Sequence, residues 1–173
     1  MAGSRINRLA GLAAFVAVAD AVITVLGRQT FVANAGRYGW AVIEDPPYDG
    51  TRQRFVFCIA VAVVAAAVGV ATVFLVNRAR PGARLAVIYT LPACFVVDLF
   101  TVVYSPAGLG GNSRGASAAD NAEAAAASDK LFPLWFTGGH AIAVVALGIL
   151  ALRLVLLLRK PEHRDFYEFA AAG

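Results

Sequence analysis

Four long apolar segments constrain this chain more than any other feature of its sequence. They cover about residues 9–27, 55–76, 85–104 and 134–158. A helix needs about 20 mainly apolar residues to cross the hydrocarbon core of a bilayer. Each segment is apolar all round rather than along one stripe, which separates it from an amphipathic helix of a soluble protein. We therefore predict an all-α, integral membrane four-helix bundle in which residues 1–173 form a single membrane domain.

The composition agrees with a membrane protein. Hydrophobic residues make up 60% of the chain and charged residues 15%, whereas soluble domains are about 45–50% apolar and about 25% charged. The net charge is +4, and in a membrane protein basic residues mark the cytoplasmic loops. We therefore expect the lipid bilayer as a partner and no nucleic acid. Cys58 and Cys94 lie inside apolar segments without metal or disulfide spacing, and we predict no metal site and no cofactor.

The distribution of arginine predicts the orientation of the chain. Arg78, Arg80 and Arg84 occupy the short connection between the second and third segments, with no acidic residue among them. Basic residues also flank both chain ends, so the positive-inside rule places both termini in the cytoplasm, with outer loops at 28–54 and 105–133. The abundance of alanine and of arginine over lysine indicates the plasma membrane of a GC-rich bacterium.

Three ionisable residues lie at one depth in the predicted bundle. Asp20, Asp98 and His140 are each about six or seven residues from the outer end of their segment, which is roughly 9–10 Å at about 1.5 Å per residue. A lone charge inside a spanning helix costs about 2.5 kcal/mol or more, so such residues normally face the bundle interior and pair. We expect these three to form a cluster, with Thr24 and Thr101 one turn further out as hydrogen-bond partners.

Two interpretations of this cluster stay open. It is a proton-handling or ligand-binding site that opens outward, or it is a polar clamp that fixes the packing of the helices. A metal site from two aspartates and one histidine lacks a recognisable ligand spacing. Ser105 and Ser128 have no nucleophile-elbow context. We therefore assign no catalytic residue.

The second segment carries a pair of small residues at helical spacing. Ala65 and Gly69 are four positions apart and have further alanines around them. Small residues at this spacing let two helix backbones approach closely in a membrane. The pair predicts close helix packing, either within the bundle or against another subunit.

Several short motifs and the layout resemble the EXPERA-domain family of emopamil-binding and sigma-2-receptor-like membrane proteins. The layout is four spans with cytoplasmic termini and two outer loops, and it covers nearly the whole chain. The matching motifs are Asp45-Pro46-Pro47, Phe57-Cys58, Ala86-Val87-Ile88-Tyr89 and Leu158-Arg159-Lys160-Pro161.

The resemblance implies a lipophilic, sterol-like ligand, but the key carboxylates of that family are not found at the matching positions. The family has one carboxylate near the outer end of the first helix, where this chain has Gly27-Arg28. It has a glutamate just after the Phe-Cys pair, where this chain has Ile59-Ala60. If the resemblance reflects kinship, Asp20 or Asp98 would have to replace these carboxylates.

The sequence supports three hypotheses about function. The first is a non-catalytic accessory or assembly subunit of a larger membrane complex, based on the small residues of the second segment and the lack of a catalytic motif. The second is a protein that binds a lipophilic small molecule, or an isomerase, with its site at Asp20, Asp98 and His140. The third is proton-coupled transport through the same residues.

Overall fold

The structure is a computed structural model in which every regular element is helical over the described part of the chain. That part consists of residues 2–37, 51–78, 81–105, 126 and 130–162. No strand is present within these ranges.

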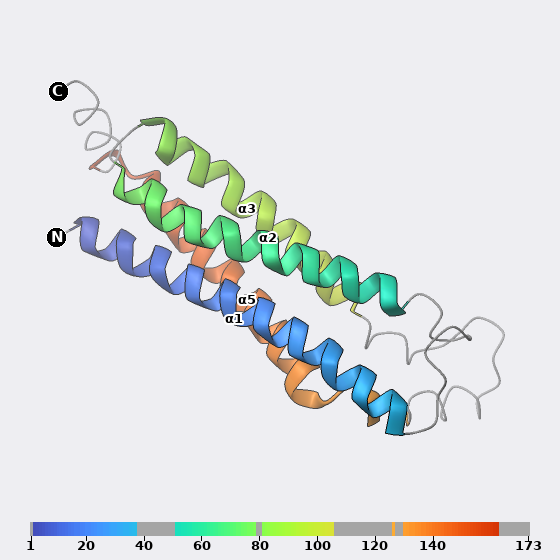
Figure 1. Ribbon diagram of the computed structural model, residues 1–173. Helices are drawn as coiled ribbons and strands as arrows, with labels where there is room; N and C mark the ends of the chain where they lie inside the picture. The colour runs from blue at the N-terminus through green and yellow to red at the C-terminus, as the bar shows by residue number, and fades with distance from the viewer. Residues whose placement is uncertain (1, 38–50, 79–80, 106–125, 127–129, 163–173) are drawn as a thin grey trace.

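Four helices are long and apolar enough to cross a membrane, as the sequence predicts. They are α1 (Ala2–Arg37), α2 (Thr51–Asn77), α3 (Pro81–Val103) and α5 (Leu134–Leu158). In the main contacts of the bundle, α1 packs against α2 and α5, and α3 packs against the same two helices. The start of α1 and the end of α5 lie at one end of the bundle (Figure 1), which we call the termini end. At the opposite end, the loop end, α1 finishes and α5 begins.

The boundaries differ most from the prediction in α1. The apolar run ends near residue 27, but the helix continues to Arg37, and α2 already begins at Thr51. The prediction of an outer loop over 28–54 is therefore wrong at both ends. The structure has helix at residues 28–37 and 51–54. The extension is stabilised by packing, because Phe31 and Ala35 are buried against Phe55. Residues 38–50, and most of the predicted loop 105–133, lie outside the described residues.

A heptad spacing underlies the packing of the first two helices. Along α1 and α2, the spacing from one buried position to the next alternates between three and four residues. This heptad spacing is the pattern of left-handed helix bundles. In α2 the buried positions are Phe55, Cys58, Ala62, Ala65, Gly69, Thr72 and Val76. In α1 they are Ala10, Ala13, Ala17, Asp20, Thr24, Gly27 and Phe31. Asp20 and Thr24 thus occupy core positions of the repeat.

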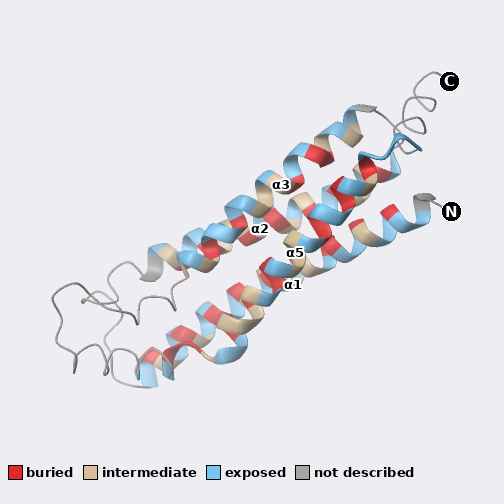
Figure 2. Ribbon diagram, turned by 180° about the vertical axis from the view of Figure 1, so that it is seen from behind, coloured by how far each residue is buried: buried red, intermediate tan, exposed pale blue. Residues whose placement is uncertain are grey.

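Large apolar side chains cover the outside of the bundle. Phe15 is 70% exposed, Ile142 71% and Leu152 61%, and pale-blue exposed positions line the outer faces of the helices (Figure 2). Buried positions, drawn in red, face the middle of the bundle and include Asp20, Asp98 and His140. Soluble proteins rarely expose apolar surface on this scale. The outer surface therefore suits an apolar surrounding.

Two apolar clusters fill the bundle on either side of these polar residues. At the loop end lies the aromatic cluster, which consists of Phe31, Ala35, Phe55, Leu131, Phe132 and Phe136. At the termini end lies the aliphatic cluster, which consists of Ile6, Ala10, Val76, Val87, Ile88, Leu91, Ala151, Leu154, Val155 and Leu158. The Phe31 and Phe132 rings stack with centroids 4.8 Å apart. The polar residues therefore lie between two apolar layers.

The small residues of α2 are used inside this chain. A Cβ atom added at Gly69 would lie 3.0 Å from Cα of Ala14 and 3.4 Å from Cβ of Ala17. Ala65, one turn away, is also buried. The absence of a side chain at Gly69 therefore lets α2 approach the backbone of α1 closely.

Arg84 has a structural contact besides its value as a topology signal. Its Nε donates a hydrogen bond of 2.7 Å to the carbonyl oxygen of Leu158, the last residue of α5. The last carbonyls of a helix have no partner within the helix, and a cation there also interacts favourably with the helix dipole. Arg84 thus joins α3 to the end of α5.

Replacing Gly69 by leucine tests the close approach of α1 and α2. The added side chain has no room beside Ala14, so we expect a loss of about 1–3 kcal/mol in the free energy of unfolding, which is typical of overpacking. The measurement is denaturant unfolding in mixed micelles. Gly11→Leu is the matched control, because nothing lies within 4 Å of a Cβ at that position, and it should leave stability unchanged. Equal effects of both variants would contradict the packing described.

Candidate functional site

His140 is the centre of a hydrogen-bonded chain that joins three helices. Its Nδ1 lies 2.8 Å from Oδ1 of Asp20 on α1, and its Nε2 lies 2.9 Å from Oγ1 of Thr101 on α3. The relative exposure of the three residues is 4%, 1% and 0% in the order His140, Asp20 and Thr101. Both ring nitrogens of a buried histidine therefore have partners, as the cost of burying polar groups requires.

The helix periodicity brings these residues together. Asp20 occupies a core position of the α1 heptad, three residues after the buried Ala17. His140 lies one turn after the buried Phe136, so both face the interior from α5. Thr101 follows Asp98 by three residues, which puts both on one face of α3.

The hydroxyl of Thr101 has two neighbours that compete for its single proton. It lies within hydrogen-bond distance of the Asp98 carbonyl oxygen and of His140 Nε2. When Thr101 donates to the carbonyl oxygen, Nε2 must carry a proton and donate to Oγ1. When Thr101 donates to Nε2, that nitrogen carries no proton. The two hydroxyl directions therefore correspond to two states of the site that differ by one proton.

The charge of the site differs between these two states. We call the state with the additional proton the loaded state and the other the unloaded state. In the loaded state, Nε2 carries one proton and a second proton is shared between Nδ1 and Asp20 Oδ1, so His140 and Asp20 together are neutral. In the unloaded state, Nδ1 donates to an ionised Asp20 and the pair carries one negative charge. The distance of 2.8 Å between His140 Nδ1 and Asp20 Oδ1 is compatible with either state.

Asp98 lies inside the bundle but does not join the hydrogen-bonded chain through its carboxylate. It is 1% exposed, yet neither Oδ1 nor Oδ2 has a hydrogen-bond partner among the described residues. Oδ2 of Asp20 also has no hydrogen-bond partner among the described residues. The structure thus brings Asp20 and His140 into direct contact and leaves Asp98 beside them, linked through its backbone carbonyl to Thr101.

Thr24 and Cys58 complete the polar layer. Thr24 is buried, but its hydroxyl donates to the backbone carbonyl of Asp20 at 2.9 Å and not to a side chain of the site. Cys58 of α2 places its Sγ 3.9 Å from the Thr101 carbonyl oxygen, so every helix contributes to the layer. No group of three or more His, Cys, Asp and Glu residues within the described ranges is placed to hold a metal ion.

Aromatic rings cover the site at the loop end. The Phe136 ring lies nearly parallel to the His140 ring, with centroids 6.4 Å apart and an interplanar angle of 14°. A Cβ at Gly27 would lie 2.2 Å from the Phe136 ring, so this ring fits against a helix position that has no side chain. One of the two interpretations from the sequence was a site that opens at the loop end, and the described residues close that end.

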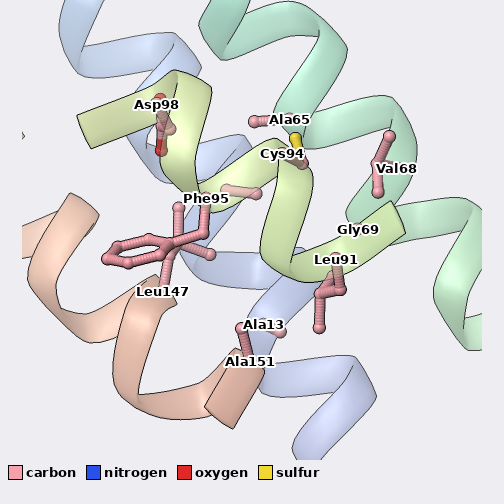
Figure 3. Close-up of a pocket in the computed structure, with 11 residues that line it drawn as sticks. Ala13, Ala65, Val68, Gly69, Leu91, Cys94, Phe95, Asp98, Leu147 and Ala151 are labelled. Carbon is pink, nitrogen blue, oxygen red and sulfur yellow. The ribbon is translucent and has the colours of Figure 1, made fainter. Parts of the chain in front are cut away.

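A small cavity lies on the other side of the site, between the four helices (Figure 3). Its volume is about 20 Å³, and Asp98 lies at one edge, with Ala13, Leu91 and Ala151 toward the other. Pockets for drug-sized ligands measure about 300–1,000 Å³. In this conformation the cavity has room for a water-sized molecule and not for a sterol.

Three contributors to the site escaped the sequence analysis: Phe136, Gly27 and Cys58. Phe136 is one turn before His140, and Gly27 is seven residues after Asp20. A search for heptad spacing around each ionisable residue would have found both, since a heptad returns to the same helix face. Cys58 lies in an apolar segment without metal or disulfide spacing, and its contact with Thr101 depends on tertiary structure alone.

Comparison with family models, with curated proteins and with solved structures finds no match for this chain. The resemblance to the EXPERA-domain family therefore stays a prediction, and function has to be argued from the site itself.

Replacing Thr101 by valine tests the hydrogen-bonded chain. The change keeps the shape of the side chain and leaves His140 Nε2 without a partner. We expect a loss of about 0.6 kcal/mol and at most about 1.7 kcal/mol in the free energy of unfolding, the average and the maximum measured for hydrogen bonds between membrane helices. Thr90→Val on the same helix is the control, since the exposed Thr90 hydroxyl donates only to the Ala86 carbonyl oxygen in its own helix. A loss no larger for Thr101→Val than for Thr90→Val would refute the role of this hydroxyl.

Proposed function

We propose that this chain is a multi-pass protein of the bacterial plasma membrane and that its Asp20–His140–Thr101 chain takes up and releases a proton during proton-coupled transport. The observation that carries the proposal is the position of the Thr101 hydroxyl, which lies between His140 Nε2 and the Asp98 carbonyl oxygen. A hydroxyl that can donate or accept supports both protonation states of the imidazole. A fixed donor or a fixed acceptor would support only one.

The surroundings of the pair favour a proton as the transported charge. Asp20 and His140 are almost fully buried, and histidine is the side chain whose ordinary titration falls nearest to neutral pH. The other titratable groups of the layer are Asp98 on α3 and Cys58 on α2. Ionisable residues inside a membrane bundle commonly mark proton relays.

The described conformation is occluded on both sides. The aromatic cluster covers the polar layer at the loop end, and the aliphatic cluster fills the termini end. Exchange of a proton with water therefore requires the helices to separate at one end or the other. Such shifts of packed helices are a common form of conformational change.

The two other hypotheses receive less support from the geometry. Gly69, one of the two small residues that predicted packing either within the bundle or against another subunit, packs α2 against α1 within this chain, so this pair gives the accessory or assembly role no separate support. A lipophilic ligand, as the EXPERA resemblance implies, would need a cavity far larger than the one beside Asp98. Both remain predictions from the sequence.

The proposed orientation predicts that both termini are cytoplasmic. Cells that carry a C-terminal green fluorescent protein fusion should fluoresce, and cells that carry an alkaline phosphatase fusion at the same position should show no phosphatase activity. The reason is the cluster of arginines between α2 and α3, which favours the cytoplasmic side. The reverse pattern would place the termini outside and overturn the assignment.

Proton flux into liposomes tests the transport proposal. Wild-type protein reconstituted with an internal pH dye should carry protons when a potassium diffusion potential is imposed. Asp20→Asn and His140→Gln should each reduce the rate to that of empty liposomes, because each removes one partner of the shared proton. His163→Gln changes the other histidine of the sequence and should leave the rate unchanged.

A wild-type protein that carries no protons at any pH would refute transport. If all variants also fold, the same result would leave the polar layer as a helix clamp.

A further inference from the structure

The carboxylate of Asp98 is a buried polar group whose partner is missing from the described residues. Asp98 is 1% exposed, and both carboxylate oxygens lack a hydrogen bond there. Buried polar atoms in folded proteins nearly always have a protein or water partner, because an unsatisfied one is costly in an apolar interior. A hydrogen bond to Asp98 must therefore come from outside the described residues.

The cavity beside Asp98 has the size for one such partner. Its volume is about 20 Å³, and a cavity needs about 10–15 Å³ or more to hold a water molecule. Its walls come from all four helices and consist largely of small side chains, among them Ala13, Ala17, Ala65 and Gly69. Figure 3 shows Asp98 at the edge of this space. The carboxylate without a hydrogen-bond partner therefore lies next to a cavity that can hold a water molecule.

The lining decides which kind of molecule fits. Asp98 and Cys94 are the only side chains with polar atoms among the residues that line this cavity. Hard metal cations take about six or more oxygen ligands, which this lining does not offer. A water molecule needs fewer partners and can donate to a carboxylate.

We propose that the cavity binds one water molecule that hydrogen-bonds to Asp98, and that Asp98 with this water is a second proton-binding position beside Asp20 and His140. The second proton-binding position rests on the proposed transport function, whereas the bound water does not. Water suits the place because it donates to an ionised carboxylate and accepts from a protonated one. Asp98 can therefore gain or lose a proton without losing its partner.

Thr101 holds the two positions next to each other, although it contacts the backbone and not the carboxylate of Asp98. Its hydroxyl contacts both the backbone carbonyl oxygen of Asp98 and Nε2 of His140. A proton that leaves the Asp98 carboxyl group breaks one O–H bond there and forms one on the cavity water, which gives a proton to bulk water when the helices separate at the termini end. The cavity lies toward the aliphatic cluster, which shares Leu91 and Ala151 with its lining. The relay therefore extends from the site toward the termini end.

Isotope-edited infrared spectroscopy tests the bound water. Protein labelled with ¹³C in the aspartate carboxyl groups is measured in lipid nanodiscs at a pH where Asp98 is protonated, and Asp98→Asn assigns the band. We expect the carbonyl band of Asp98 at the lower wavenumber of a hydrogen-bonded carboxyl group. If the wild-type band lies at the higher wavenumber of a free carboxyl group, this spectrum alone would overturn the proposal.

A cavity-filling variant sharpens the measurement. Ala65→Val adds two methyl groups to the cavity wall and should displace the water, so the Asp98 band should shift to higher wavenumber. Ala67→Val is the matched control on the exposed face of the same helix and should leave the band in place. An Asp98 band that stays the same in Ala65→Val would also overturn the proposal.

The role of Asp98 in proton transfer is measured separately. In the liposome assay, Asp98→Asn should lower the rate of proton flux at least tenfold, while the hydrogen bond between His140 and Asp20 persists in ¹⁵N spectra. An unchanged rate would remove Asp98 from the relay. A wild-type protein without flux would refute the transport function and with it the relay, whereas the infrared result on the bound water would stand.

Discussion

The hydrogen bonds from His140 to Asp20 and Thr101 are the interaction on which the arrangement of the bundle depends. They join α1, α3 and α5 at one level through side chains that are almost fully buried. In an apolar surrounding the alternative to these bonds is an unsatisfied imidazole and an unpaired carboxylate, which is far more costly than the same loss at a protein surface. The relative rotation of these helices is therefore tied to the chemistry of one histidine.

The two halves of the bundle differ because of this layer. Toward the loop end, large rings stack on one another and on His140, and Gly27 makes room for the ring of Phe136. Toward the termini end, small residues bring α1 and α2 close together and leave a cavity of about 20 Å³ next to Asp98. The site is thus dry on one side and has room for water on the other. Under the proposed function, the proton approaches the site from the side of this cavity.

Much of this arrangement could be predicted from the sequence, because the bilayer limits the possible structures to a few. The four helices follow from apolar runs, and α5 has the predicted ends, Leu134 and Leu158. Counting residues along the helices also placed Asp20 and His140 at one depth. The length of α1 could not be predicted, because its last turns are held by rings that are distant in sequence.

The facing of the side chains was harder to predict than their depth. Depth follows from counting, whereas facing depends on how each helix is rotated against its neighbours. Asp98 therefore shared the predicted layer but not the predicted contact, and Thr24 bonds to its own helix. The heptad spacing of α1 and α2 carries information on facing, and it places Asp20, Thr24 and Cys58 inside.

The most direct test of the central claim is ¹⁵N magnetic resonance of histidine-labelled protein in lipid bilayers, recorded across pH. His163→Gln leaves His140 as the single histidine. The proposed mechanism predicts that His140 has both ring nitrogens hydrogen-bonded at all pH values and that Nε2, and not Nδ1, loses its proton as the pH rises. An imidazole that keeps one protonation state over the whole range in which the protein stays folded would contradict it.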